Sequence, residues 1–359
     1  MTRVLVAGAG VAAVECVLAL RELAGTAVEV ELLAPAGELV DRPASVTTPF
    51  GAEAAPRIDL SGLGLVHRHD ALAAVSPATH EVLTRDGARI SYDQLVVATG
   101  AHSRAAVTGA VTFRGPLSAG AMERVLARAT ADPELRVAFA APAGATWPLP
   151  LYELALLTAA ALRERGVAEP DLTVVTAEEE PLAVLGAEAA AAVLGALDGA
   201  GIDVVTGAAA VAAVEGALRL DDGRVVGADV VVALGLVEGP RIPGLPHDAD
   251  GFLEIDEHGR VRGCDDVFAA GDATAFPIKH GSLAAAQADA IAETIAAGAG
   301  ALADPAPFRP VVRGMLLTGA EPLYIRAELG GSATVTTEPL WSPPAKIVGR
   351  YLTPFLAAV

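Results

Sequence analysis

The chain has 359 residues, and its 53% apolar content supplies enough apolar surface to bury the cores of two domains. Its 37 glycines and 24 prolines fall short of a low-complexity bias, so we expect an ordinary globular protein. Acidic side chains outnumber basic ones by 44 to 25, and the formal charge of −19 repels phosphate backbones, so no nucleic-acid partner is expected.

Neither the first residues nor the apolar runs predict a membrane protein. The strand pattern from Thr2 to Ala7 begins without the charged region, apolar run and cleavage site of a signal peptide. The longest apolar stretch, Leu149 to Leu162, is too short for a membrane span and contains Glu153. We therefore expect a cytoplasmic location and no transmembrane segment.

A βαβ unit opens the chain. The predicted elements are a strand from Arg3 to Ala7, a glycine turn from Gly8 to Ala13, a helix from Val14 to Leu23 and a strand from Val28 to Leu33. Alternating apolar residues then predict strands around Ala71 to Thr84 and Ile90 to Ala98.

Strands and helices alternate again from Ser118, which predicts a second parallel sheet with helical crossovers. The predicted elements are a helix from Ser118, a strand at Arg136 to Ala140, a helix at Leu151 to Arg165, a strand at Leu172 to Thr176, a helix at Ala187 to Ala200, a strand at Ile202 to Thr206, and a meander with strands at Ala217 to Leu220 and Val225 to Leu234. A hairpin from Gly251, a strand at Val267 to Ala270 and a helix near Ser282 then complete the first domain.

The order of elements predicts an α/β fold of two Rossmann-like, three-layer domains, the first discontinuous, with a small C-terminal cap. The predicted boundaries are 1–115 and 245–307 for the first domain, 116–244 for the second and 308–359 for the cap.

The turn after the first strand fits the pattern GxGxxA. Gly8 permits the tight turn, Gly10 lets a pyrophosphate approach the backbone, and Ala13 lets helix and strand pack closely. With Val11 and Ala12, these residues are candidate cofactor-binding residues; the alternative is a plain packing turn.

The acidic residue that usually holds the ribose at the end of the second strand is missing. Leu33 is followed by Ala34 and Pro35, and Glu31 lies inside the strand, where we interpret it as a solvent or edge residue.

Two further glycine-containing elements lie directly after predicted strands. Gly271-Asp272 ends the strand from Val267, where an aspartate could reach a ribityl hydroxyl or could be a simple turn residue. The next helix, starting near Gly281, would direct its positive dipole end at a flavin ring. Ala98-Thr99-Gly100 ends another strand and is a weaker mark.

Together these three elements resemble the two-dinucleotide-binding-domain flavoproteins of the pyridine nucleotide-disulfide oxidoreductase superfamily, over nearly the whole chain. The segment Val267 to Asp289 (VFAAGDATAFPIKHGSLAAAQAD) looks most like sulfide:quinone oxidoreductases and flavocytochrome c sulfide dehydrogenases.

The resemblance implies an FAD-dependent oxidoreductase that passes electrons from an unidentified small donor to a quinone, a protein carrier or oxygen. The residues it implies at FAD are Gly8, Gly10, Val11, Ala12, Ala13, Arg42, Pro43, Ala98, Thr99, Gly100, Gly271, Asp272, Lys279, His280 and Gly281. Of these, Lys279 and His280 are the candidate catalytic residues, which could stabilise an anionic hydroquinone or shuttle a proton, or could only cap a helix.

Two departures from the family limit what can be transferred. Its sulfide-oxidising members use a cysteine pair beside the flavin, whereas this chain has only Cys16 and Cys264, too few also for a cysteine-rich metal site. The strand at Arg136 to Ala140 is followed by a loop with bulky Trp147 and three prolines, which offer no N–H to a pyrophosphate. A conventional NAD(P)H site is therefore not expected.

Two rival functions remain open. One is an NAD(P)H-dependent reductase that binds nicotinamide unconventionally through Glu153 and the acidic run Glu178 to Glu180. The other is a non-catalytic flavin-binding scaffold in which the Trp147 loop fills the second site.

The aromatic residues and the C-terminal tail allow two interpretations each. Trp147, Tyr152, Trp341 and Tyr351 could wall a hydrophobic substrate pocket or belong to the core. The tail Lys346 to Val359 could make peripheral membrane contact, but packing between the subunits of a homodimer is the preferred interpretation.

Overall fold

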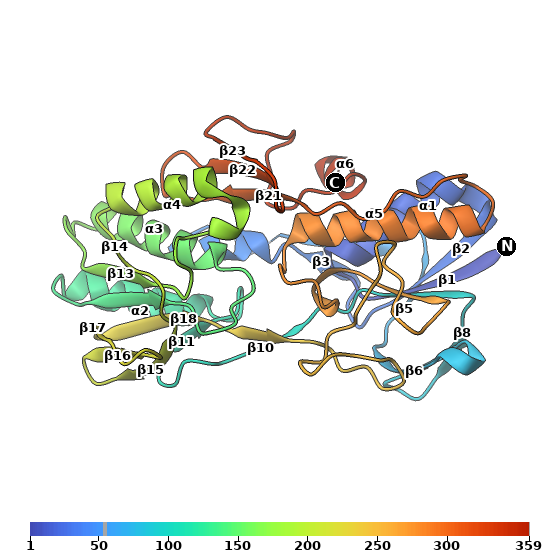
Figure 1. The fold of residues 1–359 in the computed structure, drawn as a ribbon, viewed down its shortest axis with the longest axis horizontal. Helices are drawn as coiled ribbons and strands as arrows, with labels where there is room; N and C mark the ends of the chain where they lie inside the picture. Colours follow the sequence, from blue (N-terminus) through green and yellow to red (C-terminus); the bar gives the residue numbers. More distant parts are fainter. Residues whose placement is uncertain (53–55, 359) are drawn as a thin grey trace.

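The computed structural model describes residues 1–52 and 56–358 and shows an α/β protein with two lobes side by side (Figure 1). Each lobe is built on a five-stranded parallel sheet, and a small C-terminal unit lies above both lobes in this view. The predicted fold class is confirmed, including the discontinuous first domain, because a strand from beyond the second lobe completes the first sheet.

The first sheet has the strand order β20-β9-β1-β2-β5, and all of its neighbouring strands are parallel. Its strands are β1 (Thr2–Ala7), β2 (Val28–Leu33), β5 (Val66–Arg68), β9 (Gln94–Val97) and β20 (Val267–Ala269). The order reverses between β1 and β9, so the two crossovers leave a crevice at the carboxyl ends of these strands, where doubly wound sheets bind ligands.

Helices α1 (Val11–Ala24) and α5 (Gly281–Gly298) pack side by side on one face of the first sheet. An antiparallel meander of β6 (Leu72–Ser76), β7 (Glu81–Thr84) and β8 (Arg89–Ser91) covers the other face. Strands β3 (Glu38–Val40) and β4 (Arg57–Asp59) form a separate antiparallel pair. The helix α1 begins three residues before the predicted Val14, because the extended backbone of Gly10 already caps it.

The second sheet repeats this plan with the strand order β11-β18-β12-β13-β14. Its strands are β11 (Val111–Phe113), β12 (Val137–Ala140), β13 (Leu172–Val175), β14 (Asp203–Val205) and β18 (Val230–Leu234). One face is covered by α2 (Ala119–Ala131), α3 (Leu149–Glu164) and α4 (Ala187–Gly199), and the other by the meander of β15 (Ala210–Val214), β16 (Ala217–Leu220) and β17 (Val225–Gly227).

The predicted strand at Val225 to Leu234 is in fact two strands with different roles. Strand β17 stays in the meander, whereas fully buried β18 lies next to β12 in the parallel sheet. The reason is visible in the sequence: Gly227, Ala228 and Asp229 break the apolar run and let the chain turn between the two sheets.

The lobes are joined by a two-stranded antiparallel ribbon of β10 (His102–Arg104) and β19 (Leu236–Glu238). Strand β11 belongs to the second sheet although it precedes residue 116, where the sequence placed the start of the second domain. We therefore propose that the second domain begins before Val111 and ends at the ribbon.

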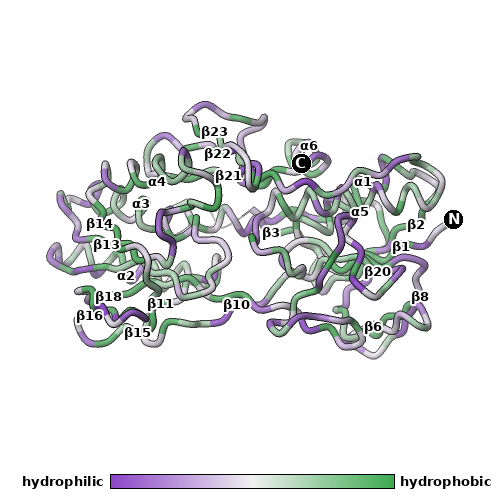
Figure 2. Tube along the Cα trace, in the orientation of Figure 1, coloured by the Kyte–Doolittle hydropathy of each residue, from purple (hydrophilic) through white to green (hydrophobic). Residues whose placement is uncertain are grey.

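The C-terminal unit consists of β21 (Val311–Leu316), β22 (Leu323–Glu328), β23 (Ala333–Thr336) and the short helix α6 (Leu352–Ala358). Strand β21 contacts α5 of the first lobe and α3 of the second, so the unit bridges the two. Hydrophobic segments concentrate in the sheets and their covering helices, with hydrophilic loops around them (Figure 2). Among the described residues, no helix is long and apolar enough to cross a membrane.

Candidate cofactor site

The glycine elements found in the sequence meet at the carboxyl edge of the first sheet. Gly8 and Gly10 follow β1, Ala98 to Gly100 follow β9, and Gly271 follows β20, and these three strands are neighbours. The residues that the motifs singled out therefore meet at the edge of the sheet where the strand order reverses.

Gly8 and Gly10 have different physical roles in the first turn. Gly8 has a φ of +130°, and a Cβ there would lie 2.1 Å from the carbonyl oxygen of Ala98, so only glycine fits against β9. A Cβ on Gly10 would meet no atom within 4 Å, so this position faces open space. Gly10 thus leaves room at the start of α1, while Gly8 brings the turn close to the neighbouring strand.

The N-terminus of α1 has no side-chain cap. The first N–H groups of a helix have no partner within the helix, and together with the helix dipole they form a site for an anionic group. An uncapped helix beside an open glycine position fits a pyrophosphate group.

Gly271 brings the first turns of α1 and α5 together. A Cβ on Gly271 would lie 3.3 Å from the Cβ of Ala12 and 3.4 Å from that of Ala284. Its N–H donates to Oε1 of Gln287 at 2.7 Å, and the Gln287 side-chain amide also donates to Thr274. Gln287, buried on α5, was not identified from the sequence, because a glutamine inside an alanine-rich helix carries no motif.

The predicted polar residues Arg42, Asp272 and Lys279 lie within electrostatic reach of one another. Burial raises the pKa of the Asp272 carboxyl, and the positive charges of Lys279 and Arg42 oppose this. Burial lowers the pKa of Lys279 to about 8, although Asp272 and Asp248 favour its charged form. Lys279 is held by a hydrogen bond to the Thr274 carbonyl, and its Nζ lies 3.8 Å from the Phe252 ring centre.

His280 is the N-cap of α5. Its Nδ1 accepts a hydrogen bond from the Ser282 N–H at 3.2 Å, so the capping role left open by the sequence is present. Burial lowers the pKa of His280 to about 3, and the imidazole is therefore neutral near pH 7. Trp147 of the second lobe packs edge-on against it, with ring centres 4.8 Å apart.

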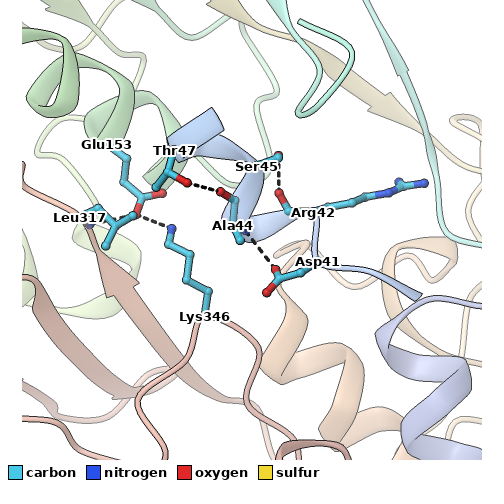
Figure 3. Close-up of polar contacts among 8 residues, drawn as sticks. All are labelled: Asp41, Arg42, Ala44, Ser45, Thr47, Glu153, Leu317 and Lys346. Atoms are coloured by element: carbon cyan, nitrogen blue, oxygen red, sulfur yellow. Dashed lines mark hydrogen bonds and ion pairs between the residues drawn. The ribbon is translucent and has the colours of Figure 1, made fainter. Parts of the chain in front are cut away.

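The loop at Arg42 and Pro43 leads into a short 3-10 helix, Pro43–Phe50, between the lobes. Asp41 accepts a hydrogen bond from the Ala44 N–H at 3.0 Å, which fixes the start of this helix. Arg42 is exposed, and its side chain extends away from the ion pair of Glu153 and Lys346 (Figure 3).

The buried pair of Glu153 and Lys346 links α3 to the C-terminal segment. The Lys346 Nζ lies 2.5 Å from Glu153 Oε1, which also accepts from the Leu317 N–H at 2.9 Å (Figure 3). The Glu153 residue is only 1% exposed. Its carboxylate is thus committed to contacts with the C-terminal unit.

The loop at the carboxyl edge of the second sheet leads into a proline-rich start of α3. Pro148 is the N-cap of α3 and Pro150 lies in its first turn, so two of the N–H groups that an anion would need are missing. Glu178, just after β13, is turned inward: the Tyr152 hydroxyl and the Leu182 N–H both donate to its carboxylate.

The remaining aromatic candidates are in structural positions. Tyr152 is completely buried, Trp341 donates to the Ala345 carbonyl at 2.9 Å and packs on Tyr324, and Tyr351 stacks beneath Arg350. The structure therefore favours the interpretation that these aromatic side chains belong to the core or to an interface.

The two cysteines lie in different hydrophobic clusters on opposite faces of the first sheet. Both are free and buried, and burial raises the pKa of each thiol. Neither is a thiolate at neutral pH, and they are not a redox pair. In the described parts of the chain, no group of three or more His, Cys, Asp or Glu side chains is arranged to hold a metal ion.

Comparisons with known proteins agree with this geometry. Residues 154–292 match the family model described as pyridine nucleotide-disulphide oxidoreductase. The sulfide:quinone oxidoreductase of the hyperthermophilic bacterium Aquifex aeolicus superposes with a TM-score of 0.85 at 19% identity, covering 94% of this chain and 87% of that one. A ferredoxin reductase for the CYP199A2 system from Rhodopseudomonas palustris gives 0.69 at 20% identity, covering 91% and 83%.

Putidaredoxin reductase, in its covalent complex with putidaredoxin, superposes with a TM-score of 0.64 at 20% identity, covering 91% of this chain and 81% of that one. A comparison with curated proteins finds no match.

The strand order defines a two-domain α/β protein with two Rossmann-like parallel sheets. The family match over residues 154–292 and the shared fold of these solved structures agree with the sequence resemblance to the pyridine nucleotide-disulphide oxidoreductase superfamily.

Proposed function

We propose that the protein is an FAD-dependent oxidoreductase, in which the flavin takes electrons from a small donor and passes them to a quinone, a protein carrier or oxygen. The observation that carries this proposal is the glycine cradle, where Gly10 faces open space beside the uncapped α1, directly next to the Gly271-Asp272 turn. Bound FAD would supply reversible uptake of two electrons, which no side chain of this protein can supply.

In this proposal the chain's own residues bind and orient the cofactor. The N–H groups of Val11, Ala12 and Ala13 face the pyrophosphate, and the carboxyl of Asp272 accepts a hydrogen bond from a ribityl hydroxyl. Ala98, Thr99 and Gly100, after β9, lie along the same edge.

Lys279, His280 and Gly281 lie at the N-terminus of α5, at the ring end of the proposed site. The neutral imidazole of His280 accepts the Ser282 N–H, so its role is to fix the start of α5 and direct the helix dipole. Lys279, with a pKa lowered to about 8, is the group that can carry a proton or a positive charge there.

We further propose that NAD(P)H is not the electron donor. Three observations support this proposal against the rival reductase function. Glu153 is paired with Lys346, Glu178 accepts a hydrogen bond from Tyr152, and α3 begins with prolines. Anaerobic mixing of the flavin-loaded protein with NADH or NADPH should leave the flavin absorbance near 450 nm unchanged. Rapid bleaching by either nucleotide would overturn this part of the proposal.

The basic proposal is tested by purification without added flavin. A yellow protein with a two-banded flavin spectrum, releasing FAD on heating, is the expected result. A colourless protein that takes up neither FAD nor FMN contradicts it. A bound flavin that a panel of donors and acceptors cannot reduce and reoxidise would favour the scaffold function instead.

A further inference from the structure

The end of β2 lacks an acidic ribose anchor, and two histidines occupy the neighbouring strand end. Ala34 and Pro35 stand where the anchor would be, and Glu31 is engaged with Arg68, whose Nε lies 2.7 Å from Glu31 Oε2. A dinucleotide lying on this edge therefore needs another group to hold its far end.

His67 and His69 lie on the α1 face of the first sheet. His67 pairs in register with Leu32, which packs in the cluster beneath α1, and His69 follows two residues later on the same side. Arg68, between them, faces the opposite side with Glu31. The two imidazoles therefore share the face from which α1 starts.

The histidine pair contacts the loop after β2, the segment in which the acidic ribose anchor would otherwise stand. The Nε2 of His67 lies 2.9 Å from the Ala34 carbonyl oxygen and donates a hydrogen bond to it. The two ring centres are 3.9 Å apart with the ring planes tilted by 42°, and a Cβ on Gly37 would lie 3.4 Å from His69 Cε1. His67 is half-buried, whereas His69 is exposed.

The histidine pair lies two strands away from the glycine turn that follows β1. The Gly8 N–H donates to the Leu33 carbonyl at 2.9 Å, and the next residue, Ala34, donates its N–H to the Arg68 carbonyl at 3.1 Å. Strand β5 is thus two strand spacings, roughly 10 Å, from β1, on the side of the sheet edge toward which a dinucleotide bound at the glycine turn would extend.

We propose that His67 and His69 form the adenosine end of the cofactor site, with the exposed face of His69 stacking on adenine and His67 holding that ring in place. This inference rests on the proposed flavin function and adds to it a basis for selecting FAD over FMN. A flat imidazole recognises the face of a base, whereas an acid would recognise the ribose hydroxyls.

The test compares ligands that contain adenosine with one that does not. Apoprotein of the wild type and of His69→Ala is titrated with FAD and FMN by flavin fluorescence and with ADP by calorimetry. The Kd for FAD and ADP should rise on the order of tenfold in the variant, and the Kd for FMN should stay the same. His69→Phe, which keeps a flat ring, should bind FAD nearly as well as the wild type.

A matched control is His247→Ala, which removes another exposed histidine from a loop away from β2 and β5. It should change none of the three constants. The inference is overturned if His69→Ala binds FAD and ADP like the wild type, or if FMN binding weakens as much as FAD binding. Failure of the flavin function itself would look different, since the wild type would then bind neither FAD nor FMN.

Discussion

At the scale of single residues, Gly8 and Gly10 form a matched pair, because one faces a backbone and the other faces open space. In Gly10→Ala the new methyl group should leave the stability of the apoprotein unchanged, since Gly10 has ordinary extended backbone angles. It should nevertheless weaken FAD binding, because the methyl enters the space proposed for the pyrophosphate. Thermal unfolding of apoprotein and fluorescence titration with FAD measure the two effects.

In Gly8→Ala the methyl group would be driven into the Ala98 carbonyl at a positive φ, so the apoprotein itself should unfold at a lower temperature. This variant is the comparison for Gly10→Ala. Equal losses of stability in the two variants would contradict the division of roles between the glycines.

The sequence predicted those site residues whose chemistry has a local signature. Gly8 is readable because a Cβ there would strike the Ala98 carbonyl, and Gly271 because it has a positive φ between two closely packed alanine side chains. Gln287, His67 and His69 are not, because their relation to the turns depends on strand pairing and helix packing across many residues. An isolated polar residue in a helix or strand gives no sign of what it faces.

At the scale of elements, the C-terminal segment is attached to the first lobe by buried carboxyl groups. Glu15, fully buried in α1, accepts hydrogen bonds from the Tyr351 and Leu352 N–H groups at 2.8 and 2.6 Å, at the start of α6. Asp289 on α5 has a buried Oδ1 without a hydrogen-bond partner in the described part of the chain. Burial and the charge of Glu15 raise the pKa of Asp289 to about 8, so we infer that it holds a proton beside Glu15.

The raised pKa of Asp289 makes stability depend on pH. The folded protein keeps a proton that the unfolded chain releases near its ordinary pKa of 3.8, so this contribution is complete below that value and is lost as pH rises to about 8. Asp289→Asn, which cannot ionise, should therefore unfold at a higher temperature than the wild type at about pH 8.5, with a smaller difference at about pH 5. The control Asp198→Asn changes an exposed helical aspartate, and its pH profile should follow the wild type. Parallel profiles for Asp289→Asn and the wild type would refute the shared proton.

The buried ion pair of Glu153 and Lys346 should be strongly coupled. Removing one partner leaves an unpaired buried charge, so Glu153→Gln and Lys346→Met should each lower the free energy of unfolding by about 3–5 kcal/mol. The double variant should lose less than the sum of the two. The exposed pair of Arg57 and Glu38 is the control, because Glu38→Gln should cost less than about 1 kcal/mol. Additive losses in chemical denaturation would show that the two buried charges act independently.

Most elements were predictable because their apolar periodicity is strong, as for β1 and α1. The division of Val225 to Leu234 was missed because an apolar run has the same pattern in an edge meander and in a central parallel strand. The role of Glu153 was also missed, since its partner Lys346 is far away in the sequence and the pairing exists only when the C-terminal unit packs on α3.

At the scale of the whole molecule, the proposed ring end of the cofactor site lies where the two lobes and the C-terminal unit come together. Trp147 from the second lobe contacts His280 of the first, and Lys346 of the C-terminal segment lies close enough to lower the pKa of His280 further. The contact between Trp147 and His280 is a property of the assembled fold that neither domain's sequence pattern contains. The substrate face of the proposed flavin site is accordingly the part that the sequence left open.

The net charge of −19 gives a final prediction about the electron acceptor. A like-charged acceptor is repelled at long range, and this repulsion is screened when added salt shortens the Debye length from about 30 Å at 0.01 M to about 10 Å at 0.1 M. Reoxidation of the photoreduced flavoprotein by ferricyanide, an anion, should therefore become faster as salt is added. Reoxidation by a neutral water-soluble benzoquinone should not change, and stopped-flow absorbance follows both reactions. A ferricyanide rate that falls with salt would instead mean that the positive charges of Arg42 and Lys279 dominate the field at the entrance, and acidic carrier proteins would then be the acceptors to test first.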